Sequence, residues 1–526
     1  MENRLVAIIE IGSTGIRLLI AQLKTSQNQN GDEWTVLDRA GRPVAFGRDV
    51  FNSGELSRES LLECLTVLSN FNEMLAAWNI AAGDVYVIAT SALRAARNRD
   101  IFIDRIQQET GFHLTLIDGI EENRLLYLGV RFALKQDLPL FWRANSMIIE
   151  VGGGSTELML LRRGQMVAAH SINMGTIIID ERIRLSAGYS HSYERYLNEP
   201  IRTTIGLLNS EMELAHIRTI VIGGSDAQLA SVHAGRELND HCRIINRNDF
   251  IDFAEKVRNF SIEECIKKLG ISYNEAEGFI PGILILKLFL ENSGAAQLIV
   301  PLISIREGYL IDLAQGGKSR PQDEFYSQII ASAVNLGRKY HFDEAHSKHV
   351  ANLCLVLFDS LVKEHGMNHR HRMMLEASAI LHDIGTFLKA SGHNKHGQYI
   401  VLNSEIFGLH RDELEIIANV IRYHRGDSPA QSDIEYMSLQ REERILVLKM
   451  TAILRIANAL DKSHSQHIRS IKVIRRAQTI DLQTQGIHDI VYDIKTPSIG
   501  IVTELIDIEE KSKLFQDVFG YKVVLS

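Results

Sequence analysis

One pattern of apolar and polar positions occurs twice along the chain. Residues 7–20 and 147–160 each contain an apolar run, a glutamate, a β-branched residue, glycine with hydroxyl residues, and a second apolar run. Short apolar runs on either side of glycine predict a strand, a tight turn and a returning strand. Because the unit occurs twice, we predict two related lobes whose hairpins face each other across a cleft.

The pattern changes near residue 320. Before it, helical spacing at 57–80 alternates with strand-like runs at 85–89, 114–117, 219–222 and 298–305, and a helix is predicted to open at Arg306. Segment 314–321 has the glycine and proline content of a linker. Beyond this segment the pattern predicts consecutive helices, and strand-like runs return only in the last part of the chain. The predicted fold class is α/β, with lobe I at residues 1–125, lobe II at 126–315, a helical domain at 322–466 and a small α/β domain at 467–526.

Composition narrows the class of protein. The 526 residues are too many for one core, and 45% hydrophobic with 23% charged residues is typical of a globular protein. The net charge of −8 argues against a general nucleic-acid binder. The four cysteines have no CxxC spacing, the start has no signal-peptide pattern, and the apolar stretch 279–290 is too short to cross a bilayer. We therefore expect reduced thiols, a cytoplasmic location, and neither a membrane nor a nucleic-acid partner.

The repeated turns have the chemistry of a phosphate site. Glycine lacks a Cβ and reaches positive φ easily, so successive N–H groups can converge on one anion, and neighbouring hydroxyls add donors. An ordinary glycine hairpin is the alternative for either turn alone. The candidate residues in the two turns are Gly12, Ser13, Thr14, Gly152, Gly153, Gly154, Ser155 and Thr156.

Two other segments carry candidate chemistry. Ser91 follows the strand at 85–89, and Arg94 lies at the start of the next helix, which suits an oxyanion. A solvated helix face is the alternative for the arginine taken alone. Glu121 and Glu122 fall in a first helical turn, where the macrodipole favours acidic residues. The functional alternative is a carboxylate that points into the cleft and orients or deprotonates a water molecule.

These motifs, in this order, resemble those of the exopolyphosphatase and guanosine pentaphosphate phosphohydrolase family. The matching segments are 10–13, 90–94, 121–124, 152–157 and the later glycine turn at Gly223 and Gly224. The resemblance covers essentially the whole chain, because longer members also carry a helical HD-type domain and a short α/β segment. It implies a two-lobed actin-like core, as in sugar kinases and chaperone ATPases. It also implies phosphate binding by the later glycine turn and by Arg17.

The resemblance implies a Mg²⁺-dependent hydrolase acting on phosphoric anhydrides. Glu122 matches the catalytic base, with Glu121 one position away, and Arg94 matches a residue that clamps phosphate oxygens. Glu10 and Glu150 stand where the family has aspartates near the metal. Each replacement lengthens the side chain by roughly 1.5 Å, and Mg²⁺ demands near-ideal geometry. Three alternatives follow for the metal site: it is preserved, it uses the metal differently, or it is inactive.

The helical domain resembles HD metal phosphohydrolases, in which a lone histidine, a His-Asp pair and a later aspartate bind a divalent ion. The matching residues are His346, His382 and Asp383. Asn458, a poorer ligand, stands at the final position, and Asp461 lies about one turn beyond it. Further histidines, His393 and His424 among them, recur on these helices. A second active site, metal binding without turnover, and a structural or substrate-channel role are the alternatives for this domain.

The leading hypothesis is an exopolyphosphatase that releases terminal orthophosphate from inorganic polyphosphate. The second hypothesis is removal of the terminal 5′ phosphate of guanosine pentaphosphate. A non-catalytic polyphosphate or nucleotide sensor would bind without turnover, and a small-molecule kinase would need an acceptor to form ADP. The expected partners are polyphosphate or guanosine pentaphosphate, together with a second copy of the chain in a homodimer.

Overall fold

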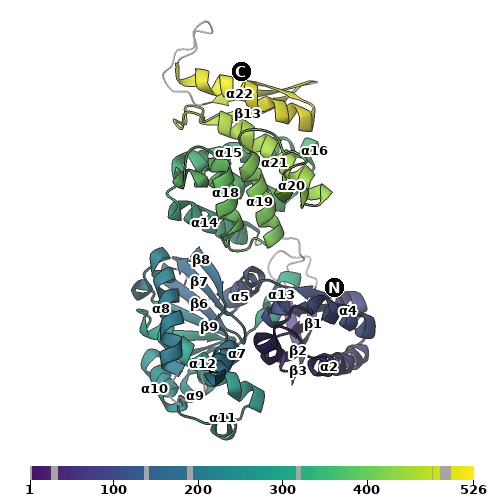
Figure 1. The fold of residues 1–526 in the computed structure, drawn as a ribbon, viewed down its shortest axis with the longest axis vertical. Coiled ribbons are helices and arrows are strands. Elements are labelled where there is room, and N and C mark those ends of the chain that lie inside the picture. Colours follow the sequence, from purple (N-terminus) through teal and green to yellow (C-terminus); the bar gives the residue numbers. More distant parts are fainter. Residues whose placement is uncertain are drawn as a thin grey trace. The chain divides into compact units, whose positions relative to one another are not determined.

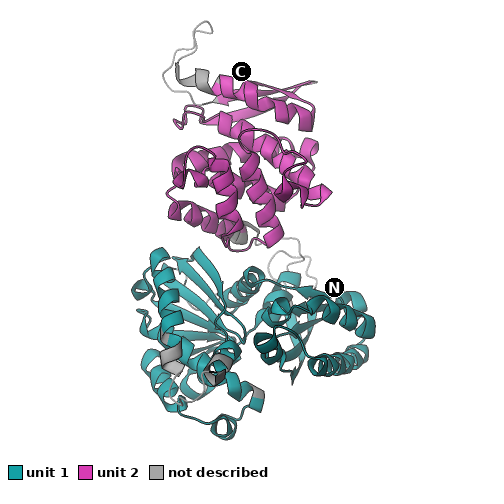
Figure 2. Ribbon diagram, viewed as in Figure 1, with its two compact units in different colours: residues 1–322 teal, residues 323–526 magenta. Residues whose placement is uncertain are grey.

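The computed structural model describes residues 3–24, 33–134, 141, 143–185, 193–314, 322–476, 478–485 and 499–525. The chain divides into two compact units, residues 1–322 and residues 323–526 (Figure 2). Residues 315–321 of the predicted linker lie outside the described residues.

The first unit contains two sheets. The strands of the first sheet are β1 (Asn3–Ile11), β2 (Gly15–Lys24), β3 (Glu33–Pro43), β4 (Val85–Ala89) and β5 (Leu114–Leu116). The strands of the second sheet are β6 (Asn145–Val151), β7 (Thr156–Arg162), β8 (Gln165–Ile172), β9 (Thr219–Gly223), β10 (Arg236–Asn239), β11 (Cys242–Asn246) and β12 (Gln297–Pro301).

The two sheets are built on one plan. Their orders are β3-β2-β1-β4-β5 and β10-β11-β12-β9-β6-β7-β8, and Figure 1 shows β8, β7, β6 and β9 side by side. In both, the first strand pairs antiparallel with the second and parallel with the fourth, so β1, β2 and β4 correspond to β6, β7 and β9. The duplication predicted from residues 7–20 and 147–160 therefore extends beyond the hairpins to the neighbouring parallel strands β4 and β9.

Strand β1 is buried on both faces. Val6 and Ile8 pack with Leu310 on one side, whereas Ile9 and Ile11 pack into the large cluster on the other side. A strand buried on both faces reads as a continuous apolar run rather than an alternating one. This is why the strand could be found from the sequence by its apolar run.

Helices cover these sheets. The helices of the first unit are α1 (Phe46–Ser53), α2 (Arg58–Ala77), η1 (Ala82–Asp84), α3 (Ser91–Ala95), α4 (Arg99–Thr110), α5 (Gly119–Ala133), α7 (Thr176–Leu185), α8 (Tyr193–Glu211), η2 (Leu214–His216), α9 (Ser225–Ala234), α10 (Arg247–Val257), α11 (Ile262–Leu269), α12 (Tyr273–Glu291) and α13 (Ile305–Ala314). The helix predicted at 57–80 corresponds to α2, and the Ser57 side chain caps it by accepting a hydrogen bond from the Ser60 N–H.

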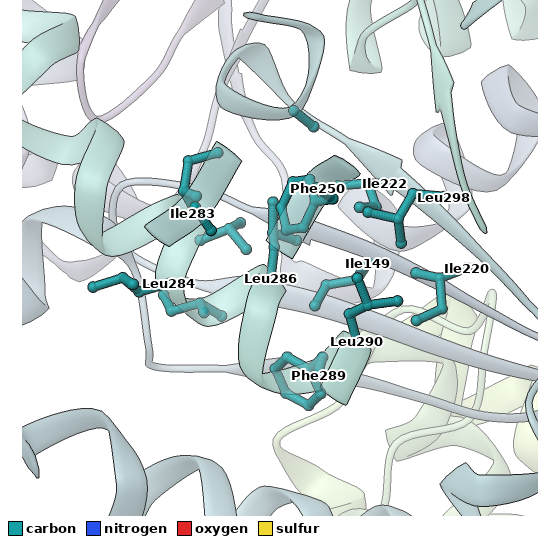
Figure 3. Close-up of a cluster of buried hydrophobic side chains, with 14 of the residues drawn as sticks. Ile149, Ile220, Ile222, Phe250, Ile283, Leu284, Leu286, Phe289, Leu290 and Leu298 are labelled. Carbon is teal, nitrogen blue, oxygen red and sulfur yellow. The ribbon is translucent and has the colours of Figure 1, made fainter. Parts of the chain in front are cut away.

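Helix α12 contains the most apolar stretch of the chain. Ile283, Leu286 and Phe289 pack against strand residues such as Ile149 and Ile220 (Figure 3). Burial in this core explains an apolar segment that is too short for a bilayer. None of the helices in the described parts of the chain has the length and apolar character needed to cross a membrane.

Helices α5 and α13 connect the two sheets of the first unit. The predicted lobe boundary at 125/126 falls inside α5, and Leu310 of α13 packs on the first sheet. The predicted strand 298–305 is too long, because β12 ends at Pro301 and α13 begins at Ile305. The Glu307 carboxylate accepts a hydrogen bond of 2.7 Å from the Ser304 N–H, which favours a helix start at this point.

The second unit has a helical part and a small sheet. Its helices are α14 (Gln322–Lys339), α15 (Glu344–Ser360), α16 (Val362–His365), α17 (His369–Leu381), η3 (Ile384–Phe387), α18 (His393–Leu402), α19 (Arg411–Tyr423), α20 (Ile434–Met437), α21 (Arg441–Ala459) and α22 (Ile499–Phe519). Strands β13 (Ser470–Arg475), β14 (Thr479–Gln485) and β15 (Lys522–Leu525) form one sheet in that order.

The architecture is a mixed α/β fold with a duplicated, actin-like core in the first unit. A mostly helical second unit ends in a three-stranded sheet, as the pattern after residue 467 predicts. The four cysteines, Cys64, Cys242, Cys265 and Cys354, are buried and free.

Candidate active site

The two repeated turns have the same backbone hydrogen bond. The Gly12 N–H donates to the Gly15 carbonyl at 2.9 Å, and the Gly152 N–H donates to the Ser155 carbonyl at 2.8 Å. In each hairpin the glycine comes directly after the last residue of the first strand. The two turns are therefore equivalent in conformation as well as in sequence order.

The turn glycines are needed for close approach rather than for unusual backbone angles. Of the candidate glycines, only Gly224 has a positive φ, of 96°. A Cβ on Gly153 would lie 2.8 Å from the Ser13 Cβ, and one on Gly154 would lie 2.8 Å from the Ser91 Oγ. The second turn therefore rests directly on the first, and any larger residue would push them apart.

The turns enclose a cleft of about 180 Å³. It is lined by residues of both sheets and of the helices that follow them. The predicted residues that line it are Glu10, Gly12, Ser13, Thr14, Arg17, Ser91, Glu122, Glu150, Gly152, Gly153, Ser155 and Gly224. The structure thus gathers residues from 10 to 224 in one place.

Five predicted residues lie beside this lining. Thr156 donates its hydroxyl to the Met174 carbonyl. Gly154 packs against Ser91, and Gly223 lies against the Glu150 side chain. Arg94 donates a hydrogen bond to Glu122, and Glu121 is bound to Arg124 by two hydrogen bonds of 2.6 Å. These residues support the cleft.

The adjacent glutamates Glu121 and Glu122 point in different directions. Glu122 lines the cleft, whereas the partner of Glu121, Arg124, also binds Asp312 of α13 at 2.8 Å. Both glutamates lie in the first turn of α5, which begins at the N-cap residue Asp118. The structure thus places Glu122 with the phosphate-binding candidates and Glu121 in a salt bridge between helices.

Glu122 is held by one arginine. The Arg94 Nη1 donates to the Glu122 Oε1 at 2.6 Å and to the Ile117 carbonyl at 2.6 Å. Burial raises the pKa of Glu122, and the charge and hydrogen bond of Arg94 oppose that rise. A carboxylate with a raised pKa that faces a cleft is better suited to accept a proton near neutral pH.

Two arginines reach the cleft from different elements. Arg17 of β2 donates to the Thr14 hydroxyl at 3.2 Å and lies 3.8 Å from the Glu10 carboxylate. Arg306, near the start of α13, lies 3.2 Å from the other oxygen of Glu10. Glu10 therefore holds both guanidinium groups at the floor of the cleft, where they can reach an anion.

Negative charge nevertheless dominates the cleft. Among the described residues that line it, six are carboxylates and two are arginines. Burial, followed by the charges of Glu10 and Glu122, raises the pKa of Glu150 to about 8. Burial and the charge of Glu275 raise the pKa of Asp226 to about 7. A phosphate chain would be repelled from this site unless protons or cations compensated the carboxylates.

The carboxylates fit a hard divalent cation. Within the described parts of the chain, no hydrogen-bond donor to the Glu150 carboxylate is found, although it is surrounded by like charges. Oxygen ligands of this kind suit Mg²⁺. Glu150 is the better placed of the two predicted ligands, because Glu10 is already close to Arg17 and Arg306.

Several residues that line the cleft were not among the predicted ones, and four of them are charged: Arg306, Asp226, Glu157 and Glu275. Glu157 accepts hydrogen bonds from Ser171 at 2.8 Å and from Asn123 at 3.0 Å. Arg306 and Asp226 each follow a strand end and a serine, the signal that identified Ser91 and Arg94. Glu157 had no such signal, because the pattern of apolar and polar residues along β7 does not show which of its residues lie beside the cleft.

The second unit brings its predicted metal ligands together. Nitrogen and oxygen atoms of His346, His382 and Asp383 lie within 4.8 Å of one another. Asp461 lies behind His346 and accepts a hydrogen bond of 2.8 Å from its Nδ1. Burial lowers the pKa of His382 to about 3, so this imidazole is neutral at physiological pH. Metal binding by this group stays a prediction.

Sequence profiles of one family match most of the chain. The profile described as the Ppx/GppA phosphatase family matches residues 25–316, and the profile of Ppx/GppA phosphatase, domain III, matches residues 330–488. The first match alone spans more than half of the chain. The two matches fall in the first and second compact units respectively.

Related proteins extend over nearly the same length. A guanosine-5′-triphosphate,3′-diphosphate pyrophosphatase of Pseudoalteromonas atlantica is 23% identical over 86% of this chain and 86% of its own. A protein of the same name from Aliivibrio fischeri is 22% identical over 89% of this chain and 91% of its own. The crystal structure of an exopolyphosphatase-like protein is similar with a TM-score of 0.50 and 21% identity, covering 60% of this chain and 98% of that one. The structural likeness is one of fold.

Proposed function

Because the chain belongs to the Ppx/GppA phosphatase family, we propose that it hydrolyses the terminal anhydride bond of a linear phosphate chain and releases orthophosphate. The observation that carries the proposal is the contact of two equivalent turns at Ser13 and Gly153, beside a buried carboxylate on Glu122. Amide and hydroxyl donors from both turns would hold the phosphate oxygens.

Glu122 is the proposed general base. It would accept a proton from the attacking water, and Arg94 would keep its carboxylate oriented toward the cleft. The raised pKa of Glu122 favours this role, since a base works best when its pKa is close to the working pH. Glu121 is excluded from the proposal because its carboxylate is committed to Arg124.

A divalent cation is part of the proposal. Glu150 and Glu10 would hold Mg²⁺, which when bound supplies positive charge to the phosphate oxygens. The excess of carboxylates over arginines in the cleft is the observation that supports this requirement. Arg17 and Arg306, which lie beside Glu10, would supply the remaining positive charge.

Inorganic polyphosphate is the proposed substrate. Among the described residues that line the cleft there is no aromatic side chain on which a guanine base could stack. The lining instead offers backbone amides, hydroxyls and arginines, which bind phosphate oxygens. Guanosine pentaphosphate is the second candidate, because relatives of nearly full length carry names for its hydrolysis.

The test compares orthophosphate release from the two substrates. Purified full-length protein with Mg²⁺ would be assayed with long-chain polyphosphate and with guanosine pentaphosphate at matched concentrations of chain ends. A higher kcat/KM for polyphosphate supports the proposal, and the reverse order makes the nucleotide the substrate. Tight binding of both with no release, in Mg²⁺, Mn²⁺ or Co²⁺, would refute hydrolysis in favour of a sensor.

Two further expectations belong to this proposal. The juxtaposition of His346, His382 and Asp383 supports an HD-type identity for the helical part of the second unit. Homodimer formation is tested by sedimentation of the full chain, where a single monomeric species at micromolar concentration would refute it.

A further inference from the structure

One serine of the cleft uses its whole hydroxyl group within the protein. Ser304 lines the cleft and directly precedes α13. Its Oγ donates to the Glu307 Oε2 at 2.5 Å, and it accepts from the backbone N–H and from the Nε of Arg306, at 3.3 and 3.1 Å. A hydroxyl has one hydrogen and two lone pairs, so none of the three is left for a ligand.

Glu307 fixes the direction of that hydroxyl. This carboxylate is 1% exposed, and its other oxygen pairs with Arg39 of β3. Burial alone would raise the pKa of Glu307. The charge of Arg39, the hydrogen bond from Ser304 and the charge of Arg306 outweigh burial and hold this pKa below its usual value. The carboxylate is therefore ionised at neutral pH and can only accept, so the Ser304 hydroxyl must be the donor of their hydrogen bond.

Arg306 is held through its Nε alone. The Nε donates to the Ser304 Oγ and lies 3.2 Å from the Glu10 carboxylate. Within the described parts of the chain, no hydrogen-bond partner of the two Nη atoms of Arg306 is found, although its side chain is only 13% exposed. A guanidinium that lines a cleft with both Nη groups unused by the protein is suited to bind two oxygens of an anion.

We propose that Ser304 is a positioning residue for Arg306 and not a ligand of phosphate. Its hydroxyl lies in the cleft like a phosphate donor, but its hydrogen is given to Glu307 and its lone pairs fix the guanidinium at Nε. The two Nη groups of Arg306 then make the contact with the phosphate chain. The inference rests on the proposed function only for the class of ligand, a chain of phosphate groups.

A helix cap is the alternative role of Ser304. Its N–H donates to Glu307 at 2.7 Å, and its carbonyl accepts from the Gly308 N–H at 3.1 Å, as at other helix starts. Loss of a cap lowers the stability of the protein but does not change its affinity for an anion. The two roles therefore differ in their effect on ligand binding.

The experiment measures binding and stability of the full-length protein. The probe is imidotriphosphate, whose P–N–P bridges resist hydrolysis, in excess Mg²⁺, and its Kd is measured by isothermal titration calorimetry. Ser304→Ala should raise this Kd by roughly two- to tenfold, the effect of losing one hydrogen bond. Ser304→Thr keeps the hydroxyl and should stay within about twofold of the wild type.

A double-mutant cycle with Arg306→Gln separates positioning from direct contact. Because the effect of Ser304 passes through Arg306, adding Ser304→Ala to Arg306→Gln should change Kd by less than about twofold. The matched control is Ser261→Ala, which removes a capping serine from α11, outside the lining of the cleft. This variant should lower the free energy of unfolding in denaturant and leave Kd unchanged.

Each outcome decides the inference. The same loss of affinity from Ser304→Ala in both backgrounds would show direct contact with phosphate, and an unchanged Kd with lower stability would show a helix cap alone. Either result overturns the positioning role, and so does a wild-type protein that does not bind imidotriphosphate. Orthophosphate release from polyphosphate is measured separately. Wild-type protein that binds the probe but releases no phosphate would refute the proposed hydrolysis, while the cycle would still decide the role of Ser304.

Discussion

Replacing Gly153 by alanine tests whether contact between the two turns is needed for catalysis. The new Cβ would lie 2.8 Å from the Ser13 Cβ and 3.0 Å from the Ile177 Cδ1. Carbon atoms in contact prefer about 3.5–4.0 Å, so the turns must separate by roughly 1 Å. A misplacement of that size costs about 100-fold in rate, which corresponds to about 2.7 kcal/mol at the transition state.

The assay measures orthophosphate release and stability together. Overpacking should also lower the free energy of unfolding by about 1–3 kcal/mol, and denaturant titration would measure it. Gly206→Ala is the matched control, because its Cβ would meet nothing within 4 Å, and its turnover should equal that of the wild type. If Gly153→Ala kept kcat within about threefold of the wild type, with the expected loss of stability, the contact would be structural and the reasoning refuted.

Three more predictions concern the cleft. Glu122→Gln should lower kcat by roughly 10²- to 10⁴-fold. Glu121→Gln should keep kcat and lower the free energy of unfolding by about 1–3 kcal/mol. Equal turnover in the two variants would show that Glu122 is not the general base. Because the pKa of Glu150 rises from 4.5 unfolded to about 8 folded, the native state binds the extra proton. Metal-free stability should therefore fall as pH rises from 4.5 through 8, and Glu150→Gln should flatten that slope in thermal melts. Arg306→Gln should raise KM for phosphate chains about tenfold or more, and an unchanged KM would place it outside the binding site.

The sequence predicted the parts of the first unit that depend on local pattern. The apolar runs before Gly12 and Gly152 became β1 and β6 with matching hydrogen bonds, and Ser57 became the N-cap of α2. The predicted family is confirmed by the profile matches, and with it the class of hydrolase acting on phosphoric anhydrides. Each of these features is encoded within a short segment.

Features that depend on three-dimensional contact were missed or misread. Position 153 requires glycine because the first turn, some 140 residues away in the sequence, packs against it in space. The sequence around Gly153 does not contain this information. Arg306 reaches the cleft only because α13 returns to the first sheet. Asp461, about one turn beyond the last HD-type position, accepts a hydrogen bond from His346 Nδ1, a contact that spacing along one helix does not contain.

The return of α13 to the first sheet has a mechanical consequence. The chain passes between the sheets twice, once after α5 and once before α13, and the two helices lie so close that Gly308 packs on the Leu125 backbone. A lobe that is connected at two neighbouring crossings can rotate about the line that joins them more easily than it can slide or twist in other directions. We therefore expect the cleft to open by rotation about this line, which would keep the donors of the two turns in register.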